Sequence, residues 1–457
     1  MLRIVAFRPP LLALCALLGC TAAVAQSNDD SPEPVRPNIV LILADDAGIE
    51  AFGPYGGTSY RTPHIAALAA RGRTFTHAFS QPLCTPSRVQ LLTGRQNYRN
   101  YEAFGWLDPD ETTFAQMLRT AGYRTAVAGK WQLSMPEPFS PIEFDAARAA
   151  PNVTPAIIRD DYGFDRYSLW QLNHVLGAGR GPRYWNPWIE RDGNLLPTRT
   201  DDYGPHMNSV WLIEFMEEAS AEGVPFLAYF PTALPHDPWV PTPLTVDGRA
   251  TDEMHSPEHF GANVEYLDRL VGELVAAVDA LGIADRTYLI FTSDNGTAVS
   301  ITSETLAGPV TGAKGHLSIP GTHVPLIIAG PGVAPGTVDH RMAGLADITA
   351  TVLAIAGLET EIEALDGLPL LPVSGHDEAP AGLLFSWYDP KGRNFPTGAV
   401  AMSPTRRLYA DGRMTFVEAS PECCVLRELD SAETGAAADV APQLRELLLM
   451  HDRWDTR

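Results

Sequence analysis

The chain has 457 residues, of which 45% are hydrophobic and 19% charged, a composition typical of a globular protein with a large core. Its formal net charge is −22, so it has no basic excess with which to neutralise phosphates, and we expect no nucleic-acid partner. An anionic substrate would need a local positive pocket.

The N-terminus has the pattern of an export signal. Basic residues precede an apolar stretch over residues 9–19, which is too short to span a bilayer permanently. Residues 23–25 fit cleavage by a signal peptidase, whereas residues 17–20 fit a bacterial lipoprotein box that would leave Cys20 lipid-modified. We therefore predict a signal peptide over residues 1–25, use of the export machinery and a periplasmic or secreted protein, with a lipid anchor as the alternative.

Strand and helix patterns alternate from residue 37 onward. Residues 37–44 are a continuous apolar run, which suits a strand covered on both faces of a parallel sheet. Similar patterns predict strands at residues 74–79, 123–128, 225–230, 287–292 and 325–329, and helices at residues 62–71, 112–120, 208–221, 263–281 and 347–356. This order indicates an α/β fold in which helices sandwich a large, mostly parallel sheet.

Polar residues follow four of these strands. They are Asp45-Asp46, Lys130, His236 and Asp294-Asn295. Taken alone, Asp45-Asp46 fits a solvated loop better than a site. Ligands of open α/β sheets bind beyond the carboxyl ends of the strands, however, so we expect the four groups to meet at one edge.

Regular periodicity is lost between residues 134 and 205, where arginine and aromatic residues are frequent. They are Arg159, Arg166, Arg180, Arg183, Arg191 and Arg199, and Tyr162, Tyr167, Trp170, Tyr184, Trp185 and Trp188. Two interpretations stay open. The segment is a substrate wall, with guanidinium groups for anions and aromatic faces for sugar rings, or it is loop packing with salt bridges.

The pattern changes after residue 372. Short strand-like pieces at residues 383–387, 399–403, 407–410 and 414–418 precede a helix at residues 442–450. We predict one large domain over residues 36–372 and a small C-terminal subdomain over residues 373–457, built from an antiparallel sheet and one helix.

A cysteine motif lies between the second and third predicted strands. Cys-x-Pro-x-Arg begins at Cys84 and is followed by Leu-Thr-Gly-Arg. Thr85 can cap a helix here, Pro86 suits its first position and Gly94 can end it. With Arg88 one turn on, the helix dipole favours a thiolate at Cys84. For an isolated cysteine, a small buried residue at a helix start is the simpler interpretation.

This motif resembles the signature of the type I sulfatases, within the alkaline phosphatase-like superfamily. The strand-end residues also follow the order of that family, from Asn38 into the C-terminal segment. The resemblance implies an alkaline phosphatase-like fold, a sulfuric ester hydrolase and a catalytic domain over residues 36–372. It also implies that a maturation enzyme oxidises Cys84 to formylglycine, an aldehyde whose hydrate attacks sulfur and later expels sulfate.

The resemblance also assigns roles to the remaining residues. The implied metal ligands are Asp45, Asp46, the modified Cys84, Asp294 and Asn295. The implied catalytic residues are Cys84, Arg88, Lys130, His236 and Lys314. The lysines would grip the sulfate, Arg88 would orient the formylglycine, and His236 would lie at the leaving group. The family implies Ca²⁺, and oxygen ligands suit Ca²⁺ or Mg²⁺ better than zinc.

Two positions depart from the family pattern. Gln132 stands where a histidine usually helps to deprotonate the hydrate, and glutamine is not a base near neutral pH. His174, His206 and His316 are candidates to replace it. His323 stands where the family usually has an arginine.

We therefore predict an exported sulfatase, with a sulfated carbohydrate as the expected substrate. One alternative keeps the fold and changes the reaction to that of a phosphonate monoesterase or phosphodiesterase. The other is a non-catalytic protein that binds sulfated glycans and whose Cys84 is never converted.

Overall fold

The structure, a computed structural model, describes residues 36–102, 104–134, 157–170, 182–246, 254–362 and 364–372, together with five strands between residues 384 and 428. The predicted leader with Cys20 and the predicted helix at residues 442–450 lie outside the described residues. Among the helices that are described, none has the length and apolar character needed to cross a membrane.

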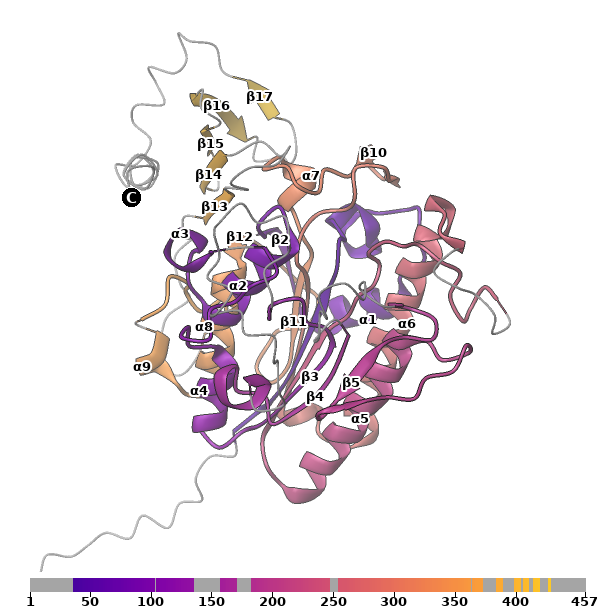
Figure 1. Cartoon of the computed structure of the whole chain (residues 1–457). Coiled ribbons are helices and arrows are strands. Elements are labelled where there is room, and N and C mark those ends of the chain that lie inside the picture. The colour runs from indigo at the N-terminus through magenta and orange to yellow at the C-terminus, as the bar shows by residue number, and fades with distance from the viewer. Residues whose placement is uncertain are drawn as a thin grey trace, which may run out of the picture. The chain divides into compact units, whose positions relative to one another are not determined.

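A ten-stranded mixed sheet, mostly parallel, forms the centre of the fold (Figure 1), in the order β12-β2-β11-β8-β1-β7-β3-β4-β5-β6. Its middle strand β1 (Asn38–Ala44) is buried along its whole length and pairs in parallel with β7 (Phe226–Pro231) and β8 (Thr287–Ser293). The other strands are β2 (Arg73–Phe79), β3 (Arg124–Lys130), β4 (Arg166–Trp170), β5 (Ile189–Arg191), β6 (Asn194–Leu195), β11 (Leu326–Ala329) and β12 (Thr337–Gly344). The continuous apolar run of β1 is explained by this central place, because helices cover both of its faces.

The sheet separates two hydrophobic cores. Val40 and Ile42 of β1 face a core with α1 (Pro63–Arg71), α5 (Gly204–Glu222) and α6 (Phe260–Ala280). Leu41 and Leu43 face the opposite core, with α2 (Cys84–Thr93), α4 (Phe114–Thr120) and α8 (Leu345–Ile355). Figure 1 shows the two helix layers on either side of the strands. Alternate side chains of one strand thus enter different cores, as the period of a strand requires.

Several elements of the structure have no counterpart in the sequence prediction. β4 lies inside the segment without periodicity and pairs in parallel with β3. A hairpin of β9 (Thr302–Thr305) and β10 (Gly308–Thr311) is inserted after β8, and β12 pairs in parallel with β2. The predicted strand at residues 325–329 exists as β11, but it runs antiparallel between β2 and β8.

The C-terminal strands form a five-stranded antiparallel sheet of their own. They are β13 (Leu384–Tyr388), β14 (Gly398–Ser403), β15 (Arg406–Ala410), β16 (Met414–Ala419) and β17 (Leu426–Glu428). Four of them match the strand-like pieces read from the sequence, and β17 is additional. Among the described residues, the remaining short α-helices are α3 (Asn97–Asn100), α7 (Ile319–Thr322) and α9 (Glu359–Ile362).

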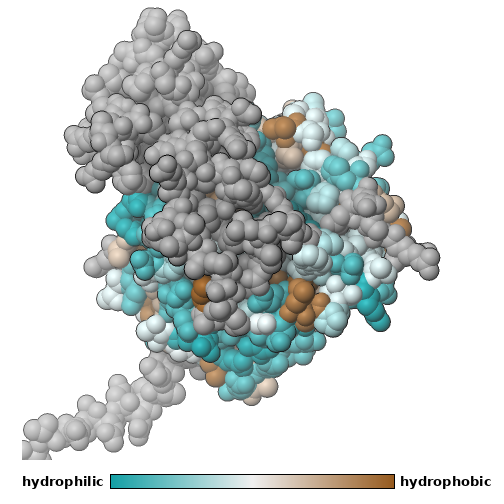
Figure 2. All heavy atoms as spheres, viewed as in Figure 1, coloured by the Kyte–Doolittle hydropathy of each residue, from teal (hydrophilic) through white to brown (hydrophobic). Residues whose placement is uncertain are grey.

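The described surface visible in Figure 2 is mostly hydrophilic, with isolated hydrophobic residues between the polar ones. Most large apolar side chains are inside the two cores. The central strands β1 and β7 are buried, and their carboxyl ends can therefore hold polar groups in fixed positions.

Candidate active site

The ends of β1 and β8 bring three carboxylates together. Ala44 and Ser293 are register partners at the last pair of these strands, and Asp294 N donates to Ala44 O at 3.1 Å. The side chains of Asp45, Asp46 and Asp294 are completely or almost completely buried just beyond this pair. The sequence prediction that these residues share one edge of the sheet therefore agrees with the structure.

The backbone at Asp46 turns sharply to make this arrangement. Its φ of +67° is in the left-handed region, which aspartate tolerates better than most residues. Two contacts hold the turn: Asp46 N donates to Asp294 Oδ1 at 3.1 Å, and Asn295 Nδ2 donates to Asp46 Oδ1 at 2.7 Å. The turn thus aims the side chains of two adjacent aspartates at different partners.

Lys130 reaches the carboxylates from the end of β3. It is 1% exposed, and its Nζ donates to both oxygens of Asp45 at 2.9 and 2.8 Å. The preceding residue is Gly129, with φ +137°, where a Cβ would lie 2.1 Å from the carbonyl oxygen of Pro231 on β7. Only glycine permits this close approach of β3 to β7, which sets the position of Lys130.

Arg88 reaches the same carboxylates from α2. Its Nε donates to Asp294 Oδ2 at 3.0 Å, and its Nη2 lies 3.6 Å from Asp45 Oδ1. Burial alone would raise the pKa of Asp45, but Lys130, His236 and Arg88 outweigh it and hold this pKa well below its usual range. Asp45 is therefore ionised at neutral pH.

Cys84 is the first residue of α2 and is 2% exposed. Its Sγ lies 3.5 Å from Asp45 Oδ1 and 3.7 Å from Asp46 Oδ1. Burial, together with the charge of Asp294, raises the pKa of Cys84 well above its usual value. The prediction of a thiolate is therefore wrong: burial beside carboxylates outweighs the dipole of a ten-residue helix.

The start of α2 also differs from the prediction in detail. The residue before the helix is Leu83, and no side chain caps it. Thr85 Oγ1 instead accepts from Gly105 N at 3.0 Å, and Pro86 is the third helical residue. The predicted end is correct, because Gly94 closes the helix with φ +66°.

Lys314 and His236 complete the polar cluster. Lys314, in the loop after β10, places Nζ 2.5 Å from Asp46 Oδ2 and 3.0 Å from His236 Nε2. His236 follows β7, and its Nε2 lies 3.5 Å from Asp46 Oδ2. Burial lowers the pKa of His236, and Lys314 and Arg183 reinforce this effect against the charge of Asp46.

The cluster has the features of a cation site. Asp45, Asp46, Cys84 and His236 each offer a ligand atom within 4.8 Å of the others. Among the described residues, the buried Oδ1 of Asn295 has no hydrogen-bond partner. Burial and the charge of Asp45 also raise the pKa of Asp294 to about 7, and a cation beside this carboxylate would favour its ionised form. The donor set therefore fits a divalent cation.

None of the described candidates to replace the missing histidine lies at these carboxylates. His206 Nδ1 is 3.7 Å from Glu273, and His316 is exposed. His174 lies outside the described residues. Gln132 is 7% exposed and has φ +52°.

His323 lies beside β2. It stacks on Phe79 with ring centroids 4.7 Å apart, and its Nε2 lies 2.8 Å from the carbonyl oxygen of Thr76. Its contacts with β2 are thus those of a residue packed against the sheet.

Over its described residues, 157–170 and 182–205, the arginine-rich and aromatic segment is mostly a region of packing and salt bridges, and Arg180 lies outside the described residues. The aromatic side chains of Tyr162, Tyr167, Trp170, Tyr184 and Trp185 are buried, and Arg159, Arg166 and Arg199 form salt bridges with aspartates. Two residues of this segment do not fit that description. Trp188 is 46% exposed, unlike the buried aromatic residues, and Arg183 contacts His236. Sequence reasoning does not single out Arg183, because nothing in its local pattern separates it from the other arginines.

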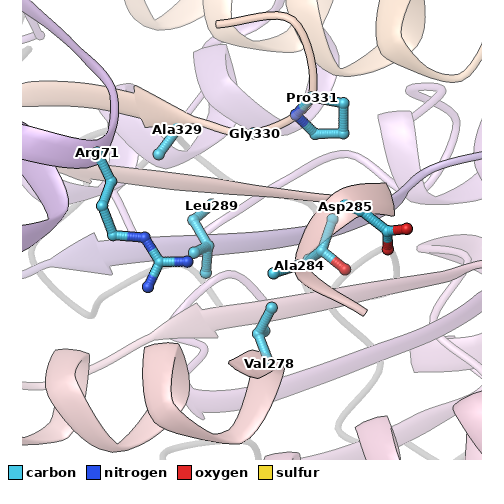
Figure 3. A pocket seen from close by; sticks show the side chains of 9 residues that line it. Arg71, Val278, Ala284, Asp285, Leu289, Ala329, Gly330 and Pro331 are labelled. Atoms are coloured by element: carbon cyan, nitrogen blue, oxygen red, sulfur yellow. The ribbon is translucent and has the colours of Figure 1, made fainter. Parts of the chain in front are cut away.

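A pocket of about 260 Å³ lies elsewhere on the sheet (Figure 3). Arg71, Asp285 and Leu289 are among its lining residues. Leu289 is near the start of β8, whereas Asp294 follows its end. The pocket is thus at the opposite edge of the sheet from the carboxylates and takes no part in the candidate site.

Comparisons with known proteins give one consistent result. A family model described as Sulfatase matches residues 37–358. Arylsulfatase A of Homo sapiens is 31% identical over 378 residues, which cover 76% of this chain and 70% of that protein. N-acetylgalactosamine-6-sulfatase of Rattus norvegicus is 30% identical over 397 residues, which cover 80% of this chain and 70% of that protein. The crystal structure of Ps i-CgsB, at 22% identity, has a TM-score of 0.70 with 92% of each chain covered, and it confirms the predicted fold class.

Proposed function

This chain belongs to the sulfatase family, whose members are sulfuric ester hydrolases, and on that premise we propose that it is an exported sulfatase acting on a sulfated carbohydrate. We propose further that Cys84 is converted to formylglycine and that the cation is Ca²⁺. The observation that carries the proposal is the cluster itself. One buried cysteine faces Asp45 and Asp46, and cationic side chains surround the same carboxylates.

The anion would be bound by the two lysines. A chain of net charge −22 repels sulfate esters at long range, so local cations must offset that charge. Asp45 holds the Lys130 ammonium group and Asp46 holds that of Lys314, and both aspartates contact Cys84. Groups fixed in this way can stabilise the charge that develops on sulfuryl oxygens without first reorganising.

The cation would be held by Asp45, Asp46, Asp294 and Asn295. These are oxygen donors, which Ca²⁺ and Mg²⁺ prefer. The buried Oδ1 of Asn295, which has no hydrogen-bond partner among the described residues, supports its inclusion in this set. When bound, the ion would supply Lewis-acid polarisation of a sulfate oxygen. Arg88 Nε donates to Asp294 Oδ2 and so keeps this carboxylate in place.

Conversion of Cys84 is supported by the state of its thiol. A raised pKa keeps the thiol protonated at neutral pH, and a protonated thiol is a poor nucleophile. Formylglycine at this position would supply a hydrated aldehyde with two hydroxyl groups. Asp45 and Asp46 lie where they contact the side chain of residue 84, and Arg88 is one turn further along the same helix.

A sulfated carbohydrate and export are supported by independent observations. A relative at 30% identity is named N-acetylgalactosamine-6-sulfatase, and that name refers to a sulfated sugar. The half-exposed Trp188 offers an aromatic face of the kind that stacks on sugar rings. The signal-peptide pattern of residues 1–25 supports passage out of the cytoplasm.

Two measurements test the proposal on the full chain expressed in its native host. Intact-mass analysis of the peptide with residue 84 should show the loss of mass that conversion of a thiol to an aldehyde causes. Paired assays should show faster hydrolysis of an aryl sulfate than of an aryl phosphonate ester. Faster phosphonate hydrolysis would assign the chain to the alternative reaction, and an unmodified, inactive protein would favour a glycan-binding role.

A further inference from the structure

Arg183 is anchored between two parts of the sheet. It is 6% exposed, and its guanidinium carbon lies 4.3 Å from the ring centroid of Trp170, the last residue of β4. From there, Nη1 lies 2.6 Å from His236 Nδ1 and donates to the carbonyl oxygen of Asp237 at 2.7 Å. One planar cation thus joins the end of β4 to the turn that carries His236.

The chemistry of guanidinium restricts the state of the imidazole. Arginine stays protonated and has only donors, so a nitrogen that hydrogen-bonds to Arg183 must accept. A neutral imidazole has one N–H group, which must then be on Nε2. Nε2 is the nitrogen that faces Lys314 at 3.0 Å and Asp46 at 3.5 Å.

We propose that Arg183 is the positioning residue for His236: it keeps Nδ1 as an acceptor and directs an Nε2–H group into the active site. This inference rests on the proposed function. With a sulfate ester bound, the Nε2–H group donates a hydrogen bond to the ester oxygen that leaves. No proton is transferred in this role, and the fixed donor stabilises the charge that develops as the S–O bond breaks.

The opposite tautomer has support from other neighbours. The carbonyl oxygen and Oδ1 of Asp237 lie 2.6 and 3.0 Å from His236 Nδ1, and Lys314 could donate to Nε2. Two contacts favour the Arg183 arrangement. Arg183 Nη1 contacts Nδ1 at 2.6 Å and also donates to the carbonyl oxygen of Asp237 at 2.7 Å, so this oxygen already has a donor, and the Lys314 ammonium group is bound by Asp46 at 2.5 Å. The stacked Trp170 also prevents Arg183 from turning away.

Nitrogen NMR on the full chain with ¹⁵N-labelled histidine tests the tautomer without any turnover. A His236→Gln variant identifies the resonances. We expect a pyridine-type signal for Nδ1 and a pyrrole-type signal for Nε2, and we expect Arg183→Met to reverse or average the two. Arg191→Met is the matched control, because Arg191 stacks on Trp211 and donates to Ser168 but does not contact His236. A pyrrole-type Nδ1 in the unaltered protein would overturn the proposal.

Kinetics on a series of aryl sulfates provide the second test. Arg183→Met should lower kcat by about tenfold to a hundredfold for poor leaving groups and by much less for nitrophenyl sulfate. Added guanidinium should restore part of the rate in Arg183→Ala. A loss that is equal for all leaving groups, without rescue, would mean that Arg183 is only structural. If the unaltered protein cleaves no sulfate ester, the proposed function fails, whereas the NMR result still decides the role of Arg183.

Discussion

The raised pKa of Asp294 leads to a prediction about cation binding. In the metal-free protein this carboxyl group titrates at about pH 7, because it is buried beside Asp45. A proton on Asp294 competes with a cation for the same oxygens, so the affinity for Ca²⁺ must rise with pH. Above about pH 8 the carboxyl group is ionised and the affinity should level off.

The size of the effect follows from this pKa. At pH 6 about nine in ten molecules carry the proton, so the affinity should be about tenfold weaker than at pH 8. Each further unit of pH below 6 should weaken binding by another factor of about ten, or about 1.4 kcal/mol. Binding should release about 0.9 proton at pH 6 and about 0.1 proton at pH 8.

Calorimetric titration of the metal-free protein with calcium chloride, in two buffers of different ionisation enthalpy, measures both quantities. Asp294→Asn should weaken binding and remove its dependence on pH. The control is Asp347→Asn, because burial also raises the pKa of Asp347, to about 6, but this residue caps α8 away from the site. An affinity that is constant between pH 6 and pH 8 in the unaltered protein would refute the reasoning.

Three further predictions concern the same edge of the sheet. Lys130→Ala should destabilise the metal-free protein by about 3–5 kcal/mol in urea unfolding, because Asp45 keeps a buried charge without this partner; unchanged stability would contradict that account. Gly129→Ala should cost more in thermal unfolding than Gly122→Ala, because both have positive φ but only Gly129 meets backbone at 2.1 Å; equal costs would show that the contact relaxes. Gln132→His should preserve or raise the rate of sulfate release in single-turnover experiments, whereas a large loss would mean that Gln132 has a role of its own.

Local sequence patterns are sufficient to predict several features of this molecule. The apolar run of β1 predicts a buried strand, because only a strand inside a sheet has cover for every side chain. Asp45, Lys130 and Asp294 each follow or end a predicted strand, and the sequence correctly predicts that they lie together. The carboxyl ends of neighbouring parallel strands meet at one edge of the sheet. Gly94 ends its helix as its position predicts.

Other features depend on contacts between distant parts of the chain. β4 has no periodic pattern and exists because β3 offers it a parallel partner. The raised pKa of the Cys84 thiol comes from its burial and from the charge of Asp294, far away in sequence, and not from the helix that begins at Cys84. Among the described arginines, Arg183 is set apart by its contacts with Trp170 and His236.

The physical reason for this division is the range of the forces involved. Hydrophobic periodicity and helix ends are properties of a few consecutive residues, so the sequence alone determined the order of strands and helices and the residues at their ends. A pKa or a hydrogen bond depends on all the groups within a few ångströms, whatever their place in the chain. Only the tertiary structure therefore decided which charges face one another and which arginine reaches His236.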